Sequence, residues 1–231
     1  MEINKKHYFM SIVFIGEYSP LMFQPHWMLK NNVIDQAEYD SIELKNKEKC
    51  VISDAIAFYE TDGFSFRIEK NRFQIISKKK PFALAIDTLS KLAEVFPSFP
   101  ISAFGLNYYF HVSIDDKNKM ELIGKTLAPR DYWGELFEKN FDDDTKKSGL
   151  TSISFKKFEE NHILNVTMET SAKLKSGLFF NYNFHYNKNE ECYDFEDVLS
   201  IIQSDYQNHE NKAHVITQQL INNVLSEEEH D

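Results

Sequence analysis

The chain has 231 residues, of which 42% are hydrophobic, and a formal net charge of −10. This amount of apolar material excludes a disordered chain, and the negative charge opposes attraction to phosphate backbones and anionic membranes. With only 7 Gly and 6 Pro, the sequence lacks low-complexity linkers and the glycine-rich loops that cradle phosphates. Cys50 and Cys192 form no paired motif, which favours a reducing compartment, so we expect a cytoplasmic protein.

The first half begins with β-branched and aromatic residues at positions 8–15, which predict a buried strand. This run is too short to span a bilayer and lacks a cleavage site of small residues, so no membrane association is expected. Prolines at positions 20 and 25 favour a short helical or irregular crossing. Alternating patterns then predict strands at residues 55–60, 64–69 and 73–77, before a helix that starts at Pro81 and ends near Pro97.

The second half opens with the clearest strand, at residues 101–114, where apolar side chains occupy every second position. A crossing follows, with helices expected near residues 119–125 and 131–137. Strands are predicted at 151–158, 163–168 and 178–186, and a long helix at 194–225. Residues 226–231 form an acidic tail that we expect to fray.

The order strand, crossing, three strands, helix therefore occurs twice, at about residues 7–97 and 100–225. We predict an α+β fold in a single compact domain made of two pseudo-repeated halves. The expected sheet is mostly antiparallel, with the helices packed on one face and the other face free.

A short pattern, N-Y-x-F-H, occurs at residues 107–111 and again at 181–185, each time in an expected strand. The Asn and His of each copy fall on the more polar face, and on neighbouring strands they would converge. Such a cluster hydrogen-bonds a ligand, binds a metal through imidazoles or supplies a general base; the alternative is a solvated sheet face. Two histidines without a nearby carboxylate make a poor metal site, so neither a metal nor a cofactor is expected. The candidate ligand-binding residues are Asn107, His111, Asn181, Asn183 and His185.

Residues 67–80 are locally basic, with phenylalanines close to the cations. Interleaved aromatic and basic side chains suit single-stranded nucleic acid. A hairpin with a lysine-protected edge is the favoured alternative, because the aromatic residues alternate inward and the chain is acidic. The candidate nucleic-acid contacts are Arg67, Arg72, Lys78, Lys79 and Lys80.

Both tryptophans, Trp27 and Trp133, lie close to prolines. Exposed aromatic residues of this kind anchor partner interfaces, whereas buried ones would plug the core from the crossing segments. Trp27 and Trp133 are therefore the candidate partner-binding residues.

The opening motif SIVFIG at residues 11–16 is followed by Pro20, Phe23, Pro25 and Trp27. With Gly105-Leu106-Asn107, His111, Leu127-Ala128-Pro129, Trp133 and residues 183–186, it resembles a group of uncharacterised bacterial proteins of similar length. The resemblance touches most of the chain at scattered positions. It implies common ancestry and transfers no activity.

The motifs GxGxxG, Walker A, GxSxG and HExxH are all missing from the sequence. Together with the acidic charge and the free sheet face, this favours a non-enzymatic protein-interaction module. Such a module would act as an immunity or antitoxin-like protein, or as an accessory subunit of a bacterial defence system, with a basic partner drawn to it electrostatically. Two alternatives stay open: a ligand-binding domain or hydrolase using the Asn/His face, and nucleic-acid binding by the sheet.

Overall fold

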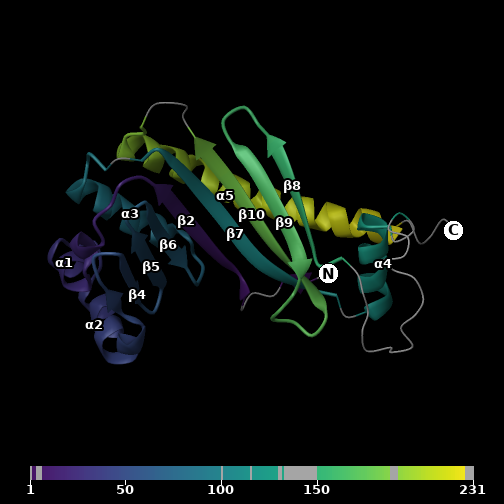
Figure 1. The fold of residues 1–231 in the computed structure, drawn as a ribbon, viewed down its shortest axis with the longest axis horizontal. Helices are drawn as coiled ribbons and strands as arrows, with labels where there is room; N and C mark the ends of the chain where they lie inside the picture. The colour runs from purple at the N-terminus through teal and green to yellow at the C-terminus, as the bar shows by residue number, and fades with distance from the viewer. Residues whose placement is uncertain are drawn as a thin grey trace.

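The segments with alternating apolar residues form one large sheet that is flanked by helices (Figure 1). The computed structural model describes residues 2–3, 7–99, 101–114, 116–129, 132, 150–187 and 192–226. Within these ranges the strands pair antiparallel in the order β3-β4-β5-β6-β2-β7-β10-β9-β8, and β1 also pairs with β7. The strands are β1 (Glu2–Ile3), β2 (Phe9–Ile15), β3 (Val51–Ile52), β4 (Ile56–Glu60), β5 (Phe64–Glu69), β6 (Arg72–Ser77), β7 (Ala103–Ser113), β8 (Ser152–Phe158), β9 (Ile163–Thr170) and β10 (Gly177–Asn187).

Helices fill the connections and the C-terminal part of the chain. None of those in the described ranges is both long enough and apolar enough to cross a membrane. Of the helix expected at residues 131–137 only Tyr132 is described, and of the expected tail only Ser226. The helices are η2 (Pro20–Phe23), α1 (Pro25–Lys30), α2 (Gln36–Lys45), η3 (Lys47–Lys49), α3 (Ala83–Val95), α4 (Lys117–Leu127) and α5 (Phe195–Ser226).

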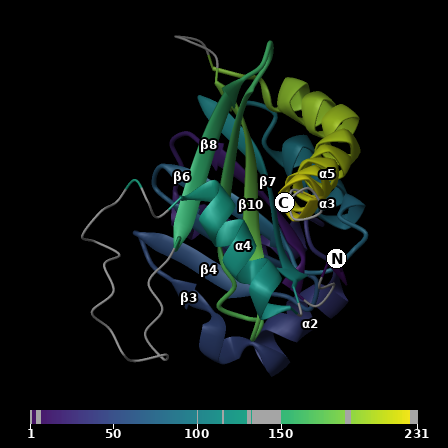
Figure 2. The same cartoon turned by 90° about the vertical axis from the view of Figure 1, so that its right-hand side faces the viewer.

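The centre of the sheet is the antiparallel pair β2–β7, in which Ser11 lies opposite Asn107. Because successive side chains of a strand point to opposite faces, residues two apart share a face. Met10, Ile12 and Phe14 share one face and are fully buried. Phe14 contacts Phe195 of α5, so this is the face on which α3 and α5 pack (Figure 2). This apolar face is the main core of the molecule.

Tyrosine hydroxyls tie the long helix α5 to this core. A buried tyrosine needs a hydrogen-bond partner for its hydroxyl, and here α5 supplies the partners. Tyr8 donates to Glu210 Oε1 at 2.5 Å, Tyr108 to the Tyr206 carbonyl at 2.5 Å and Tyr186 to Asp205 Oδ2 at 2.8 Å, while Tyr182 lies 2.7 Å from Thr217 Oγ1.

The α+β class and the mostly antiparallel sheet expected from the sequence are confirmed. The two-residue strands β1 and β3 were not predicted, because two residues carry no detectable period. Part of the expected crossing is the regular helix α2, which begins with a capping box between Asp35 and Glu38.

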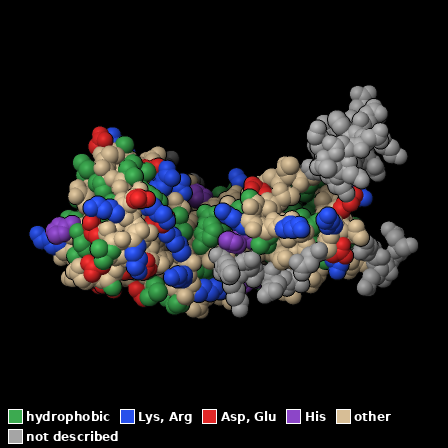
Figure 3. Space-filling model, turned by 90° about the horizontal axis from the view of Figure 1, so that it is seen from below, with side chains coloured by type: hydrophobic (Ala, Val, Ile, Leu, Met, Phe, Trp, Pro, Cys, Tyr) green, Lys and Arg blue, Asp and Glu red, His purple; other side chains and the backbone are tan. Residues whose placement is uncertain are grey.

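No helix of the described residues covers one face of the sheet, which faces the viewer in Figure 1, in front of α5. Seen from below in Figure 3, the outline on this side dips between the part that contains α1, α2 and β4–β6 and the part that contains β8 and β9. The strand register places Ser11, Asn107 and Asn183 on this face. We call it the open face.

Candidate functional site: the open face of the sheet

Three asparagine side chains form a hydrogen-bonded chain across the open face. Asn165 Nδ2 donates to Asn183 Oδ1 at 3.0 Å, and Asn183 Nδ2 donates to Asn107 Oδ1 at 2.7 Å. Asn107 Nδ2 then donates to the Ser11 carbonyl at 3.3 Å. We call Asn107, Asn183 and Asn165 the amide row; it joins strands β7, β10 and β9 and ends on β2.

Gly105 makes room for the amide row. A Cβ atom at this position would lie 2.9 Å from Asn183 Nδ2, closer than such atoms approach in proteins. Asn107 is only 5% exposed although no helix within the described ranges covers it, and its side chain hydrogen-bonds to Ser11, Gly105 and Asn183. The row is therefore held in place by its surroundings rather than lying loosely on the surface.

Aromatic rings lie beside the amide row. Tyr109 stacks on Phe9 with ring centroids 4.8 Å apart and lies parallel to Phe179 at 6.4 Å. The Tyr109 hydroxyl lies 3.4 Å from Ser11 Oγ. Asn181, opposite Tyr109, has a buried Oδ1 that accepts no hydrogen bond from the described residues. The open face thus offers flat apolar surface next to amide groups.

His111 is held by Ser171, with 2.7 Å between Nδ1 and Ser171 Oγ. Ser171 Oγ already accepts hydrogen bonds from the backbone N–H groups of Lys173 at 3.1 Å and Leu174 at 2.9 Å. Both lone pairs of the hydroxyl are then in use, so its proton points to His111 Nδ1, which makes the imidazole neutral with its hydrogen on Nε2. Burial, followed by nearby His7 and Lys173, lowers the pKa of His111. Ser171 therefore positions His111 and has no free lone pair for nucleophilic attack.

The residues predicted as one site occupy different rows of the same face. Asn107 and Asn183 are in contact, whereas His111 lies opposite Phe179 and His185 opposite Gly105. Burial, with a smaller effect of Lys156, lowers the pKa of His185. Residues two positions apart on a strand are separated by about 6.8 Å. His111 and Gly105, the residue opposite His185, are six positions apart on β7, so the two histidines lie toward opposite ends of this strand pair.

The structure places the predicted basic residues on both sides of the sheet. Arg67 pairs with Glu69 at 2.6 Å on the open face, and Lys78 pairs with Glu60 at 2.8 Å. Lys80 pairs with Glu210 of α5, on the covered side. Arg72 Nη2 donates to Gln74 Oε1 at 3.3 Å on the open face, and Lys79 is exposed.

Trp27 is half-buried and stacks on Phe96 with ring centroids 5.0 Å apart. It packs against the core from α1, which is the alternative in which a tryptophan of a crossing segment fills space in the core. Trp133 lies outside the described residues.

A histidine cluster that the sequence did not predict lies under α5. His209 stacks on Phe184 at 3.8 Å, and its Nε2 lies 2.6 Å from the Tyr186 hydroxyl. The ring of His162 lies 4.8 Å from that of His209. Burial and then the proximity of His162 lower the pKa of His209 to about 4. Among the described residues, no group of His, Cys, Asp and Glu side chains is arranged to hold a metal ion.

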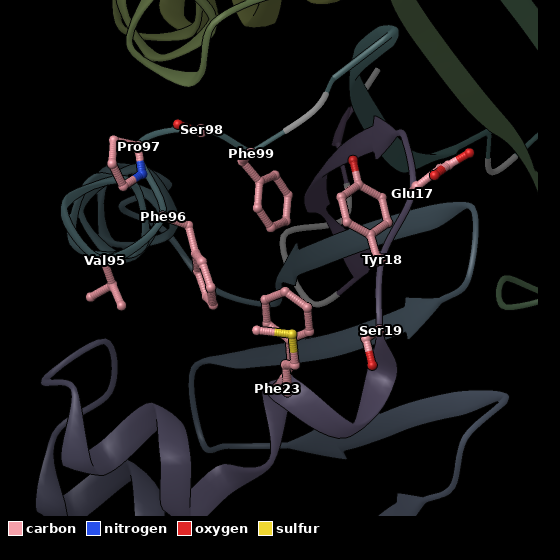
Figure 4. Close-up of a pocket in the computed structure, with 10 residues that line it drawn as sticks. Glu17, Tyr18, Ser19, Phe23, Val95, Phe96, Pro97, Ser98 and Phe99 are labelled. Carbon is pink, nitrogen blue, oxygen red and sulfur yellow. The ribbon is translucent and has the colours of Figure 1, made fainter.

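An apolar pocket of about 290 Å³, also not predicted, lies between η2 and the C-terminal end of α3 (Figure 4). Aromatic side chains dominate its lining. The sequence signal was the density of Phe and Pro at residues 96–99 and 20–25, but no local pattern shows that these segments meet. The lining includes Tyr18, Met22, Phe23, Val95, Phe96 and Phe99.

No protein-family model matches this chain, and no curated protein is significantly similar to it.

Proposed function

We propose that this chain is a non-enzymatic protein-interaction module that binds its partner on the open face. The observation that carries the proposal is the amide row, with its flanking aromatic rings, on a sheet face that none of the described helices covers. Amides present donors and acceptors at fixed positions, and tyrosine and phenylalanine rings supply contact area with little loss of conformational entropy.

The charges of the open face favour a protein over a nucleic acid. Among its described strand residues, the basic and acidic side chains balance, and Arg67 is neutralised by Glu69. A nucleic-acid surface would carry an excess of unpaired cations. The charged residues of this face are Arg67, Arg72, Lys156, Glu60, Glu69 and Glu169.

The net charge of −10 supports a basic partner, because opposite charges speed diffusional association. An immunity or antitoxin-like protein that neutralises a basic toxin, or an accessory subunit of a bacterial defence system, would have this character.

We also propose that the sheet consists of two pseudo-repeated halves that meet at the β2–β7 pair. The strand order supports this proposal: outward from the centre, β2 is followed by β6, β5 and β4, and β7 by β10, β9 and β8. In each half the last strand of a three-stranded meander pairs with the central strand, and one helix, α3 or α5, follows that meander in sequence.

Site-specific photocrosslinking in cells of the native host tests the open face as the binding surface. Benzoylphenylalanine replaces Phe179 or Phe158, both on the open face, and in matched controls replaces the half-exposed Leu84 of α3 or Val215 of α5. We expect one discrete protein adduct from the open-face positions and none from the helix positions.

Adducts only from Leu84 or Val215 would move the partner to the helix side and overturn the proposal. An adduct that nuclease destroys would replace the protein partner with a nucleic acid. Crosslinking to a small molecule alone would favour the ligand-binding alternative.

A further inference from the structure

We propose that the pocket between η2 and α3 is a second binding site, which takes a planar aromatic ring that is neutral or carries a neighbouring positive charge. The pocket lies on the helix side of the sheet, because Phe23 at its floor contacts Phe73, which shares a face with the buried Phe14. It is therefore separate from the open face.

The floor and walls of the pocket are preformed. The rings of Phe23, Phe96 and Phe99 contact one another with centroids 5.6 to 5.9 Å apart, and Tyr18 stacks on Phe99 at 4.7 Å. Phe96 is held from behind by Trp27. Rings locked in this way keep the cavity open without a ligand, so binding requires little ordering of the protein.

The size and the lining favour a ring. A pocket of about 290 Å³ is roughly twice the volume of a cavity of about 150 Å³ that holds benzene, so a two-ring system fits. Aromatic walls give offset-stacked and edge-to-face contacts that an aliphatic chain does not make. Met22, which is 47% exposed and part of the lining, extends the apolar surface at the mouth.

Charge selects among such rings. Glu17 is exposed and belongs to the lining next to Tyr18, and Figure 4 shows its side chain on the far side of Tyr18 from the phenylalanine rings, so its carboxylate lies beside the pocket and not inside it. The other polar side chains of the lining are the hydroxyl-bearing Tyr18, Ser19 and Ser98. A carboxylate on the ligand would be repelled by Glu17, whereas an ammonium group or a ring N–H would be attracted to it.

The test is titration of the full chain with three probes that share one ring: indole, tryptamine and indole-3-acetate, followed by NMR or by fluorescence quenching. We expect tryptamine to bind about fivefold more tightly than indole-3-acetate, the scale of exposed ion pairs, with indole between them. Glu17→Gln should remove this order and leave indole binding unchanged. Equal binding of the three probes by the wild type would overturn the charge selection, and binding of none would overturn the site.

Two further variants keep the test independent of folding. Ser98→Trp places a large side chain at the exposed mouth and should abolish binding of all three probes, whereas Ser200→Trp, on the exposed face of α5, should not. Both variants should melt like the wild type. Unchanged tryptamine binding by Ser98→Trp would show that the probes bind elsewhere.

A final arm distinguishes the source of the ring. A blocked peptide with Trp next to Lys is compared with tryptamine: tighter binding of the peptide assigns the pocket to an aromatic side chain of a protein, and tighter binding of tryptamine assigns it to a free amine. Either result supports the pocket, and neither depends on the crosslinking from the open face.

Discussion

Asn183 donates a 2.7 Å hydrogen bond to Asn107 across the β10–β7 pair, directly above Gly105. Gly105→Ala is expected to break this bond, because the new Cβ would meet Asn183 Nδ2 at 2.9 Å. Leaving the two amides incompletely paired should lower the free energy of unfolding by about 1–3 kcal/mol. Denaturant unfolding measures the change.

Gly124→Ala is the matched control for this substitution. Gly124 lies inside α4, and a Cβ atom added there would have no other atom within 4 Å. Alanine in a helix interior is favoured over glycine, so this variant should gain roughly 0.5–1 kcal/mol. A loss of stability in both variants would mean that Gly105 has no special relation to the amide row.

The amide row should show graded effects along its length. Asn183 makes two of the side-chain bonds and Asn165 makes one, at the end of the row. Asn183→Ala is therefore expected to lower the free energy of unfolding by about 1 kcal/mol more than Asn165→Ala, because it leaves two amide partners without a hydrogen bond instead of one. Equal losses in thermal or denaturant unfolding would indicate that the row is not a connected unit.

The sequence predicted that Asn107 and Asn183 would converge if their strands were neighbours, but it did not predict the register that pairs them. The two N-Y-x-F-H copies run in the same direction along the chain, whereas β7 and β10 are antiparallel. One copy is therefore reversed against the other, which puts His111 opposite Phe179 and His185 opposite Gly105. Alternation within each strand was readable locally, but register is a long-range property.

The pocket and the histidine cluster could not be predicted for a related reason. Phe23 meets Phe99, and His162 meets His209, only because distant segments are brought together by the packing of α3 and α5. Periodicity correctly placed Val198, Ile202 and Ala213 on the buried side of α5. It carried no information about which strand residues would face them.

Association with the partner should depend on salt. With a net charge of −10, the chain attracts a basic partner through long-range forces that ions screen over about 8 Å at physiological ionic strength. Raising the salt from about 50 to 500 mM should slow association about tenfold and change dissociation little. Stopped-flow mixing with the crosslinked partner, once purified, measures both rates; an unchanged association rate would remove electrostatic steering from the proposal.

Acid should loosen the contact between α5 and the sheet, because His209 is held neutral there. Its pKa in the folded protein is about 4, against 6.5 for a free imidazole, and burial is the main cause. The unfolded chain thus binds a proton between pH 6.5 and 4 that the folded chain does not. Stability contributed by neutral His209 is complete above pH 6.5 and is lost as the pH falls toward 4.

Allowing for solvent screening, we expect a loss of about 2 kcal/mol over this range. The pKa of His162 is also lowered by burial, partly offset by Glu159, so it adds to the same trend. Guanidinium unfolding at several pH values, compared between wild type and His209→Gln, tests the assignment, with the exposed His26→Gln as control. The His209 variant should show a flatter pH dependence and the His26 variant the full slope; identical slopes in all three proteins would place the acid sensitivity away from α5.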